Sequence, residues 1–377
     1  MLDCQAFYEV LQSRGVDFYA GVPDSLLKDF CAYVTDHTPP ERNVITANEG
    51  SAVALASGYY LGTGKPGVVY MQNSGLGNTV NPLTSLADVK VYGIPMLLVV
   101  GWRGEPGKKD EPQHVTMGVV TTGVLDAIGV PWEVLPDEQD AAAAAVERAL
   151  AAMTERSAPY ALVVRDKTFS PYKLKNKTKS PYEMTREAAI RAVIERLPSD
   201  ALIVSTTGKP SREVFEVRVQ RGEPHDRDFL TVGSMGHSSQ IALGIAMQHP
   251  MRPITCLDGD GAVLMHMGGL ATIGVSGATN YRHIVVNNGA HDSVGGQPTC
   301  AFGIDIAKVA LACGYKAAWS VSSEEELASV WADFSATPGP VLLEVRVAIG
   351  ARDDLGRPKQ SPADLKVAFM GAIKAGA

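Results

Sequence analysis

Two polar clusters in the second half of the sequence each directly follow an apolar run. They are Gly259-Asp260-Gly261, after residues 254–257, and Asn287-Asn288-Gly289-Ala290, after residues 283–286. Mg²⁺ binds hard oxygen ligands in near-octahedral geometry. Asp260 could supply a carboxylate oxygen, Asn288 a side-chain amide oxygen and Ala290 a backbone carbonyl oxygen. Each cluster alone would indicate an ordinary turn, but together, at this spacing, they predict a magnesium site.

The same clusters have the residue types of a diphosphate site. Gly259 and Gly261 lack Cβ atoms, so the backbone could approach a phosphate closely. A helix expected to open near Ala262 would direct unpaired N–H groups towards the same anion. If both apolar runs are parallel strands, their carboxyl ends meet at one edge of the sheet, where open α/β sheets bind ligands. We therefore expect a metal–diphosphate site at that edge.

The elements that would position these clusters alternate along the whole chain between β-branched apolar runs and amphipathic stretches. Strands are expected at residues 16–22, 43–47, 68–72, 96–100 and 160–165, and again at 201–205, 254–257, 283–286, 317–321 and 340–345. Helices are expected at residues 25–34, 50–61, 83–92 and 141–154, and again at 185–196, 238–248, 264–276, 304–313 and 324–334. This alternation predicts an α/β protein with two doubly wound parallel-sheet domains.

A polar, basic stretch bounded by prolines interrupts the alternation at residues 167–183. We interpret it as a linker between a first domain at residues 1–166 and a second at residues 184–377, because the alternating pattern restarts after it. A long surface loop within one domain is the alternative. There is also a weak internal repeat, because two glycines have the same sequence separation in each half of the chain. This repeat favours two domains of similar architecture.

Composition excludes several classes of protein. The chain has 34 Lys and Arg residues against 41 Asp and Glu, a formal net charge of −7, which argues against a general nucleic-acid binder. No signal peptide and no apolar run of membrane-spanning length is visible, so we expect a cytoplasmic protein without a membrane span. The five cysteines are scattered and never spaced as C-x-x-C, which predicts reduced thiols, with neither a disulfide framework nor a zinc site.

The paired clusters resemble the diphosphate-binding signature of the thiamine-diphosphate enzymes. In that family one domain holds the diphosphate through Mg²⁺ and another holds the aminopyrimidine ring, usually across a subunit interface. The resemblance implies that residues 1–166 form the pyrimidine-binding domain and residues 184–377 the diphosphate- and Mg-binding domain. It also implies thiamine diphosphate and Mg²⁺ as cofactors, and a homodimer or larger assembly. Many relatives carry a third domain between these two, whereas this chain has no middle domain.

The resemblance assigns roles to individual residues. Glu49 matches the glutamate that hydrogen-bonds the pyrimidine ring and favours its imino form; a helix N-terminal acid is the alternative. Gly233 would offer its carbonyl to the pyrimidine amino group, and Met235 would support the thiazolium, although core packing would also suit a methionine. Thr207 and Gly208, which could also simply form a turn, would cover the diphosphate alongside the glycine cluster already described.

Two segments of the first half resemble decarboxylases of this family. Asp24 follows the first expected strand, and His114 lies in an expected loop at residues 111–114. Both are candidates for proton transfer after CO₂ leaves and for positioning the substrate carboxylate. The alternatives are an N-cap role for Asp24, before the helix at residues 25–34, and a structural role for His114.

Four further segments resemble the phosphonopyruvate decarboxylase family, with sulfopyruvate decarboxylases as close relatives: Gly21–Ser25, Gln72–Asn78, His291–Thr299 and Gly350–Pro358. The implied reaction converts phosphonopyruvate, a small anionic 2-oxo acid, to phosphonoacetaldehyde and CO₂. Sulfopyruvate decarboxylation and carboligation by the same cofactor are alternatives. A nucleotide-binding module or oxidoreductase is a third, but no strand is followed by G-x-G-x-x-G and no G-x-x-x-x-G-K-[ST] occurs.

A tetrahedral dianion on the substrate needs cations or hydrogen-bond donors around it. The available cations are Arg103, Lys108, Lys109, Arg352, Arg357, Lys359 and, when protonated, His291. Ser25 could add a hydroxyl group. We take Ser25, His291, Arg352 and Arg357 as the substrate candidates, because residues 352–358 contain glycine and proline and could fold over the site.

Overall fold

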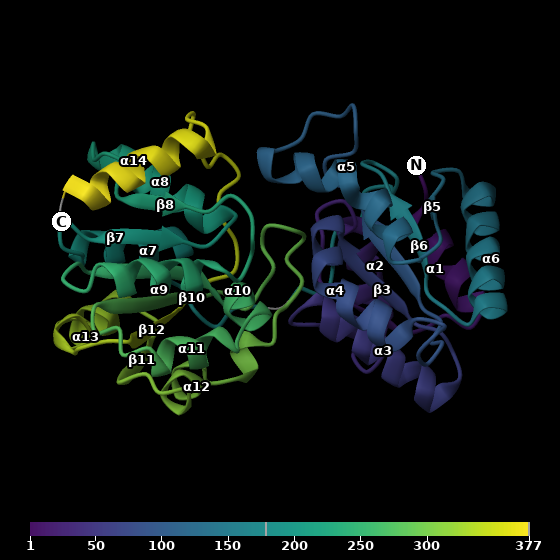
Figure 1. Cartoon of the computed structure of the whole chain (residues 1–377), viewed down its shortest axis with the longest axis horizontal. Coiled ribbons are helices and arrows are strands. Elements are labelled where there is room, and N and C mark those ends of the chain that lie inside the picture. Colours follow the sequence, from purple (N-terminus) through teal and green to yellow (C-terminus); the bar gives the residue numbers. More distant parts are fainter. Residues whose placement is uncertain (178, 376–377) are drawn as a thin grey trace. The chain divides into compact units, whose positions relative to one another are not determined.

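The structure, a computed structural model, describes residues 1–177 and 179–375 and divides into two compact units. Of the described residues, 1–177 and 294–297 form one unit, and 179–293 and 298–375 form the other (Figure 1). The stretch predicted as a linker contains the boundary, and one of its residues, Thr178, lies outside the described residues. Its first part packs on the first unit: the backbone of Leu2 pairs with that of Phe169, and Phe169 is buried in the core.

The first unit is built around a six-stranded parallel sheet in the order β2-β1-β3-β4-β6-β5. Its strands are β1 Tyr19–Gly21, β2 Asn43–Ile45, β3 Val68–Gln72, β4 Leu97–Gly101, β5 Trp132–Val134 and β6 Tyr160–Val164. Its helices are α1 Cys4–Ser13, α2 Lys28–His37, α3 Glu49–Thr63, α4 Leu76–Pro82, α5 Pro112–Ala127 and α6 Gln139–Arg156, with single turns at Asn73–Gly75 and Leu83–Ala87.

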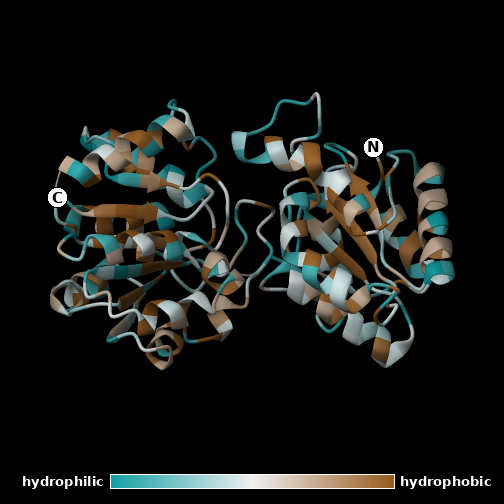
Figure 2. Ribbon diagram, viewed as in Figure 1, coloured by the Kyte–Doolittle hydropathy of each residue, from teal (hydrophilic) through white to brown (hydrophobic). Residues whose placement is uncertain are grey.

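Side chains alternate between the two faces of this sheet. Val68 and Tyr70 of β3 lie in one buried cluster, with residues of α1, α2 and α6, whereas Val69 and Met71 lie in another, with residues of α3 and α4. Strands buried on both faces read as continuous apolar runs, and these strands do. Strands β6 and β7 (Leu202–Ser205) are accordingly coloured hydrophobic in Figure 2.

The second unit has a six-stranded parallel sheet in the order β11-β12-β10-β9-β7-β8. Its other strands are β8 Asp228–Leu230, β9 Ile254–Gly259, β10 Tyr281–Asn287, β11 Ala317–Val321 and β12 Val341–Arg346. Its helices are α7 Arg186–Arg196, α8 Lys209–Arg221, α9 Ser238–Gln248, α10 Asp260–Met265, α11 Gly269–Val275, α12 Ile306–Ala312, α13 Glu324–Ala336 and α14 Pro362–Ala375, with a 3₁₀ turn at Ala301–Gly303.

The two sheets have the same topology. Counted from the first strand of each unit, both run second, first, third, fourth, sixth, fifth. In each sheet the second strand pairs with one side of the first strand, and the third strand pairs with the other side of the first strand. The carboxyl ends of the first and third strands flank the point where the direction of winding reverses, which is where open α/β sheets bind ligands. The predicted α/β class with two doubly wound parallel sheets is thus confirmed.

Some individual elements differ from the prediction. The short edge strands β5 and β8 and the helices α1, α4, α5, α8 and α14 were not predicted. The helix expected at residues 83–92 ends at Ala87, and the one expected at 264–276 is two helices, α10 and α11, separated around Met267 and Gly268. Among the described residues, no helix combines the length and apolar character needed to cross a bilayer.

Candidate functional site

The two polar clusters of the second unit meet at the ends of neighbouring strands. Strands β9 and β10 pair directly, with Gly259 opposite Val286. Helix α10 begins at Asp260, two residues earlier than predicted, with Gly259 as its extended N-cap. The backbone N–H of Asn288 hydrogen-bonds the Asp260 carboxyl group. The acid and the amide predicted as metal ligands are therefore neighbours.

Asp260 is a buried carboxylate. Its Oδ2 accepts a hydrogen bond of 2.5 Å from the hydroxyl of Thr299. Burial raises the pKa of Asp260 to about 6, against the opposing effect of its hydrogen bonds. A nearby cation favours the charged form of a carboxylate, so this buried acid has the character of a metal ligand.

Asn288 and Ala290 lie in a tight turn after β10. The Asn288 side-chain oxygen accepts the Ala290 N–H at 3.2 Å, and its nitrogen donates to Asp292 at 2.6 Å. Gly289 between them has a left-handed φ of +65°, and a Cβ there would lie 2.6 Å from the Phe302 ring. A side chain at this position would strain the turn. Asp260 and Asn288 are thus neighbours, Ala290 lies two residues after Asn288, and carboxylate, amide and carbonyl oxygens are the donor types that fit Mg²⁺.

Met235, Gly261 and His291 adjoin one another beside this turn. A Cβ placed on Gly261 would lie 3.2 Å from Cε of Met235 and 3.3 Å from Cε1 of His291. Between the predicted cofactor contacts Gly233 and Met235, Ser234 adopts a left-handed φ of +56°. Burial lowers the pKa of His291 to about 4, so this side chain is neutral near pH 7 and offers hydrogen bonds without charge.

Thr207 and Gly208 lie between β7 and α8, at the reversal point of the second sheet. Gly208 is the N-cap residue of α8, with a φ of +90°, and a Cβ there would lie 3.1 Å from Oγ of Ser293. A Cβ on Gly259 would lie 3.8 Å from the methyl group of Thr206. The loop therefore adjoins the glycine cluster, and the first N–H groups of α8 open towards the same edge.

Glu49 is the first residue of α3, and Asn48 caps the helix by accepting the Ser51 N–H. The side chain of Glu49 is buried, and its Oε2 accepts a hydrogen bond of 2.7 Å from the amide of Asn78. Gly75 approaches so closely that a Cβ there would lie 2.5 Å from Oε1 of Glu49. The sequence predicts no role for Gly75 or Asn78, although both lie in the segment Gln72–Asn78 that carries the family resemblance.

Asp24 is buried after β1 and uses one oxygen structurally. Its Oδ2 accepts the N–H groups of Leu26 at 2.8 Å and Leu27 at 3.3 Å. Helix α2 starts later, at Lys28, with Leu27 as its N-cap residue, so Asp24 supports the preceding turn. Its other oxygen, Oδ1, has no hydrogen-bond partner within the described part of the chain. Burial raises the pKa of Asp24 to about 6.

His114 lies in the first turn of α5, which begins at Pro112, so the loop predicted at residues 111–114 is wrong. The sequence PQHVTMGVVTTGVLDA mixes glycine with β-branched residues of low helix propensity, which hid the helix. Burial, reinforced by the positive charge of Arg103, lowers the pKa of His114. This histidine is therefore neutral near pH 7.

Arg103, after β4, joins two other polar residues of the first unit. Its Nε and Nη2 donate to Asp110 at 2.8 and 2.5 Å, and its Nη1 donates to the Ser25 hydroxyl at 2.8 Å. Buried Asn73 holds the backbone here, donating to the Arg103 carbonyl at 2.7 Å. Sequence reasoning had included Arg103 among the available cations but had missed Asn73, whose only signal was its place directly after a strand.

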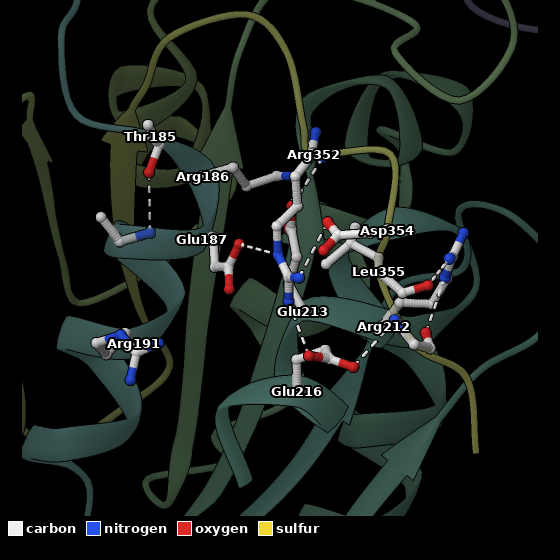
Figure 3. Close-up of polar contacts among 12 residues, drawn as sticks. Thr185, Arg186, Glu187, Arg191, Arg212, Glu213, Glu216, Arg352, Asp354 and Leu355 are labelled. Carbon is white, nitrogen blue, oxygen red and sulfur yellow. Dashed lines mark hydrogen bonds and ion pairs between the residues drawn. The ribbon is translucent and has the colours of Figure 1, made fainter. Parts of the chain in front are cut away.

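Arg352 is surrounded by carboxylates. Its guanidinium donates to Glu187 at 2.9 Å, Glu216 at 2.8 Å and Asp354 at 3.1 Å (Figure 3). Arg357, further along the same segment, is exposed. The structure ties this segment to α7 and α8, and the assignment of both arginines to the substrate stays a prediction.

Cys256, Asp258 and His283 form a second group whose ligand atoms lie within 4.8 Å of one another. All three are buried inside the sheet, on β9 and β10. Asp258 Oδ2 and His283 Nε2 are 3.5 Å apart, and neither atom has a hydrogen-bond partner within the described part of the chain. We interpret the group as a buried polar pair beside a buried thiol.

Both units match known protein families. Residues 4–126 match the model of the thiamine pyrophosphate enzyme N-terminal TPP binding domain, and residues 208–345 match that of the C-terminal TPP binding domain. The chain is 39% identical to a phosphonopyruvate decarboxylase of Streptomyces viridochromogenes, over 96% of this chain and 93% of that protein. It is 36% identical to a phosphonopyruvate decarboxylase of Streptomyces hygroscopicus, over 95% and 91%. A sulfopyruvate decarboxylase of Methanosarcina acetivorans is 28% identical over 87% of each chain.

Proposed function

The chain belongs to the thiamine pyrophosphate enzyme family, and from that membership we propose that it decarboxylates phosphonopyruvate to phosphonoacetaldehyde and CO₂. One observation carries this proposal: similarity to phosphonopyruvate decarboxylases extends over almost the whole of both chains. The residues gathered at the sheet edges support it, because they are of the types that such a reaction needs.

Thiamine diphosphate and Mg²⁺ are the proposed cofactors. The residues present fit them, because Asp260, Asn288 and Ala290 offer carboxylate, amide and carbonyl oxygens, the kinds of donor that Mg²⁺ binds, and Asp260 and Asn288 are neighbours. The proposed diphosphate contacts are the backbone groups of Gly259, Gly261, Ala262, Thr207 and Gly208. When bound, the cofactor supplies a carbanion at C2 of its thiazolium ring and the electron sink that decarboxylation needs.

Glu49 is the proposed partner of the pyrimidine ring nitrogen. Asn78 occupies Oε2 of Glu49, and Gly75 keeps side-chain atoms away from Oε1. This arrangement leaves Oε1 as the oxygen available to a ring nitrogen. Gly233 and Met235 are the proposed supports of the bent cofactor on the other domain, where Met235 adjoins Gly261.

Asp24 and His114 are the proposed proton-transfer residues. A general acid–base group works best when its pKa lies near the working pH, and Asp24 has a pKa of about 6 with one oxygen free of hydrogen bonds among the described residues. Its Oδ1 can hold and release a proton without disturbing the turn that Oδ2 supports. The neutral imidazole of His114 would orient the substrate carboxylate by hydrogen bonding.

The distal phosphonate needs donors close to that position. The Ser25 hydroxyl follows Asp24 directly and accepts a hydrogen bond from Arg103, whose charge is paired with Asp110, so the proposed contribution of this pair is a hydroxyl group held in place. His291 would add a neutral donor next to Met235. Arg357 stays a candidate, while Arg352 already neutralises three carboxylates.

We further propose a homodimer or larger assembly with the active site between subunits. Helix α5 supports this, because Val115 and Val119, one helical turn apart, are 52% and 61% exposed. Exposed apolar groups on one helix face mark association surfaces. A second copy of the chain is the proposed occupant of this face.

The deciding experiment measures CO₂ and aldehyde release from phosphonopyruvate and sulfopyruvate side by side, with thiamine diphosphate and Mg²⁺ present. We expect phosphonopyruvate to have the higher kcat/KM. Sulfopyruvate decarboxylation is the second candidate, favoured by the relative from Methanosarcina acetivorans, and a higher kcat/KM for sulfopyruvate would establish it instead. A ligation product formed with an added acceptor aldehyde would indicate a carboligase, and reduction of NAD(P)⁺ an oxidoreductase.

A further inference from the structure

Three hydrogen-bond donors from distant parts of the second unit meet on one oxygen of Asp292. Its Oδ2 accepts from the Asn288 amide at 2.6 Å, from Nη1 of Arg186 at 3.1 Å and from the Gly350 N–H at 3.0 Å. The Asp292 side chain is only 8% exposed. Such a convergence fixes the carboxylate in a single orientation.

Arg186 is itself held in a buried fork. Its Nε and Nη2 donate to the two carboxylate oxygens of Glu213 at 2.7 and 3.0 Å, and both side chains are buried. Removing such charges from water costs free energy that their attraction often fails to recover. Stability alone therefore explains this pair poorly. A bidentate pair does hold its guanidinium rigidly, and the Arg186 guanidinium held in this way donates a hydrogen bond to Asp292.

A second layer of ion pairs secures the third donor. Arg352 bridges Glu187, next to Arg186 on α7, and Glu216, one turn after Glu213 on α8 (Figure 3). These contacts anchor the segment that begins at Gly350 to the same two helices. The Gly350 N–H is thereby held where it meets Asp292.

The consequence concerns which end of the Asn288 amide faces the metal site. An ionised carboxylate only accepts hydrogen bonds, so the Asn288 nitrogen must face Asp292. The side-chain oxygen is then turned away from Asp292, on the side where it accepts the Ala290 N–H. An amide turned the other way would present N–H groups, which cannot bind a cation.

We propose that Asp292 is a positioning residue for the metal ligand Asn288, and that the buried Arg186–Glu213 pair holds Asp292 in place. The inference rests on the proposed function, because it takes Asn288 as a ligand of the divalent cation. Asp292 itself does not touch the metal. It selects the amide orientation that makes Asn288 a ligand.

The test is the affinity of the purified protein for Mn²⁺ in the presence of thiamine diphosphate, measured by electron paramagnetic resonance. Replacing a residue that orients a metal ligand typically lowers affinity about 10–100-fold, and we expect a loss of that size for Asp292→Asn. Asp354→Asn is the matched control. It makes the same chemical change at an exposed aspartate, which pairs with Arg352 and not with Asn288. An Asp292→Asn affinity equal to that of the control would overturn the proposal.

A double-mutant cycle separates orientation from general damage. The two oxygens of an aspartate are equivalent, so an Asn288→Asp side chain has nothing to orient and is instead repelled by Asp292. In the Asn288→Asp background, Asp292→Asn should leave Mn²⁺ affinity unchanged or raise it. The same loss in both backgrounds would show that Asp292 merely supports the fold. If Asp292→Asn does not fold, Glu213→Gln tests the same network, with a smaller loss of affinity expected and an unchanged affinity counting against the proposal.

Asp260→Ala distinguishes this inference from the proposed function. Unchanged Mn²⁺ affinity in Asp260→Ala would mean that the metal site itself is assigned wrongly. Lost affinity in Asp260→Ala, together with normal affinity in Asp292→Asn, would refute only the positioning role.

Discussion

The side-chain amide of Asn78 donates a hydrogen bond of 2.7 Å to Oε2 of Glu49. The two residues come from consecutive helices, since Glu49 opens α3 and Asn78 lies in α4. The bond orients a buried carboxylate that would otherwise rotate about its side-chain torsions. Helix α4 thus serves the proposed catalytic acid, although it contributes no catalytic group itself.

Glu49→Gln should abolish most turnover while leaving the fold intact. General acid–base groups contribute about 10²–10⁴-fold to rate, and glutamine keeps the size of the side chain but cannot ionise. Asn78→Ala should cost less, about tenfold in kcat, or about 1.4 kcal/mol of transition-state stabilisation. Asn81→Ala, an exposed asparagine on the same helix, is the control. Steady-state kinetics and circular dichroism check these outcomes, and near-normal turnover in Glu49→Gln would remove Glu49 from its role.

A methyl group at Gly75 should reduce activity by displacing Glu49. The backbone of Gly75 has a φ of −70°, which alanine adopts freely, so the effect does not arise from backbone strain. The new Cβ would lie 2.5 Å from Oε1 of Glu49. Gly77→Ala is the matched control, because nothing lies within 4 Å of a Cβ there. We expect reduced kcat in Gly75→Ala and wild-type kcat in Gly77→Ala; equal rates would contradict the close approach.

Asp24→Asn should stabilise the protein increasingly as the pH rises. Burial raises the pKa of Asp24 to about 6, so the folded chain holds this proton more tightly than the unfolded chain. The stability that Asp24 contributes is therefore complete below the unfolded pKa, about 4, and is lost as the pH rises through about 6. Asparagine never ionises, so the variant does not lose this stability. For a pKa difference of about two units between the folded and unfolded chain, the loss of folding free energy in the wild type is about 2–3 kcal/mol.

Melting temperatures at pH 5 and pH 8 check this prediction. The difference between Asp24→Asn and the wild type should grow in favour of the variant between these two values. Asp333→Asn, at an exposed position on α13, provides the comparison and should show no such growth. A constant difference for Asp24→Asn would mean that Asp24 is not destabilised by burial. The same variant should lose activity, as expected when a buried acid is kept for chemistry at the expense of stability.

The fold and the proximity of Asp260 to Asn288 follow from local patterns, whereas the contacts that orient Glu49 do not. Asp260 and Asn288 each end an apolar strand, and parallel strands bring such ends together, so their meeting was predictable. Gly75 and Asn78 act on Glu49 only because α4 packs beside α3, a tertiary contact that no local pattern encodes. Helix α5 was missed because its glycine and β-branched residues disfavour helix, although Pro112 at its start was a usable signal.

Asp260→Ala should remove the stabilisation that Mg²⁺ and thiamine diphosphate give to the wild type. A ligand at 100 times its Kd stabilises the folded state by about 2.7 kcal/mol, which should appear as a higher melting temperature. Chelation of the metal should reverse this shift in the wild type. Asp260→Ala should melt at the same temperature with or without both cofactors. A normal cofactor-induced shift in the variant would contradict the assignment of Asp260.

Val119→Asp should dissociate the proposed dimer and lower activity together. Val119 is 61% exposed on α5, and in the assembly it would lie against a second copy of the chain. Burying an unpaired carboxylate costs several kcal/mol, so the assembly should weaken by several orders of magnitude in Kd. Val367→Asp, at a valine that is 65% exposed on α14, is the matched control and should stay associated.

Sedimentation velocity gives the assembly state, and kcat measured over a range of protein concentrations tests whether activity depends on assembly. A monomeric Val119→Asp enzyme with full activity would show that one chain contains a complete site, because activity would then not depend on the partner subunit.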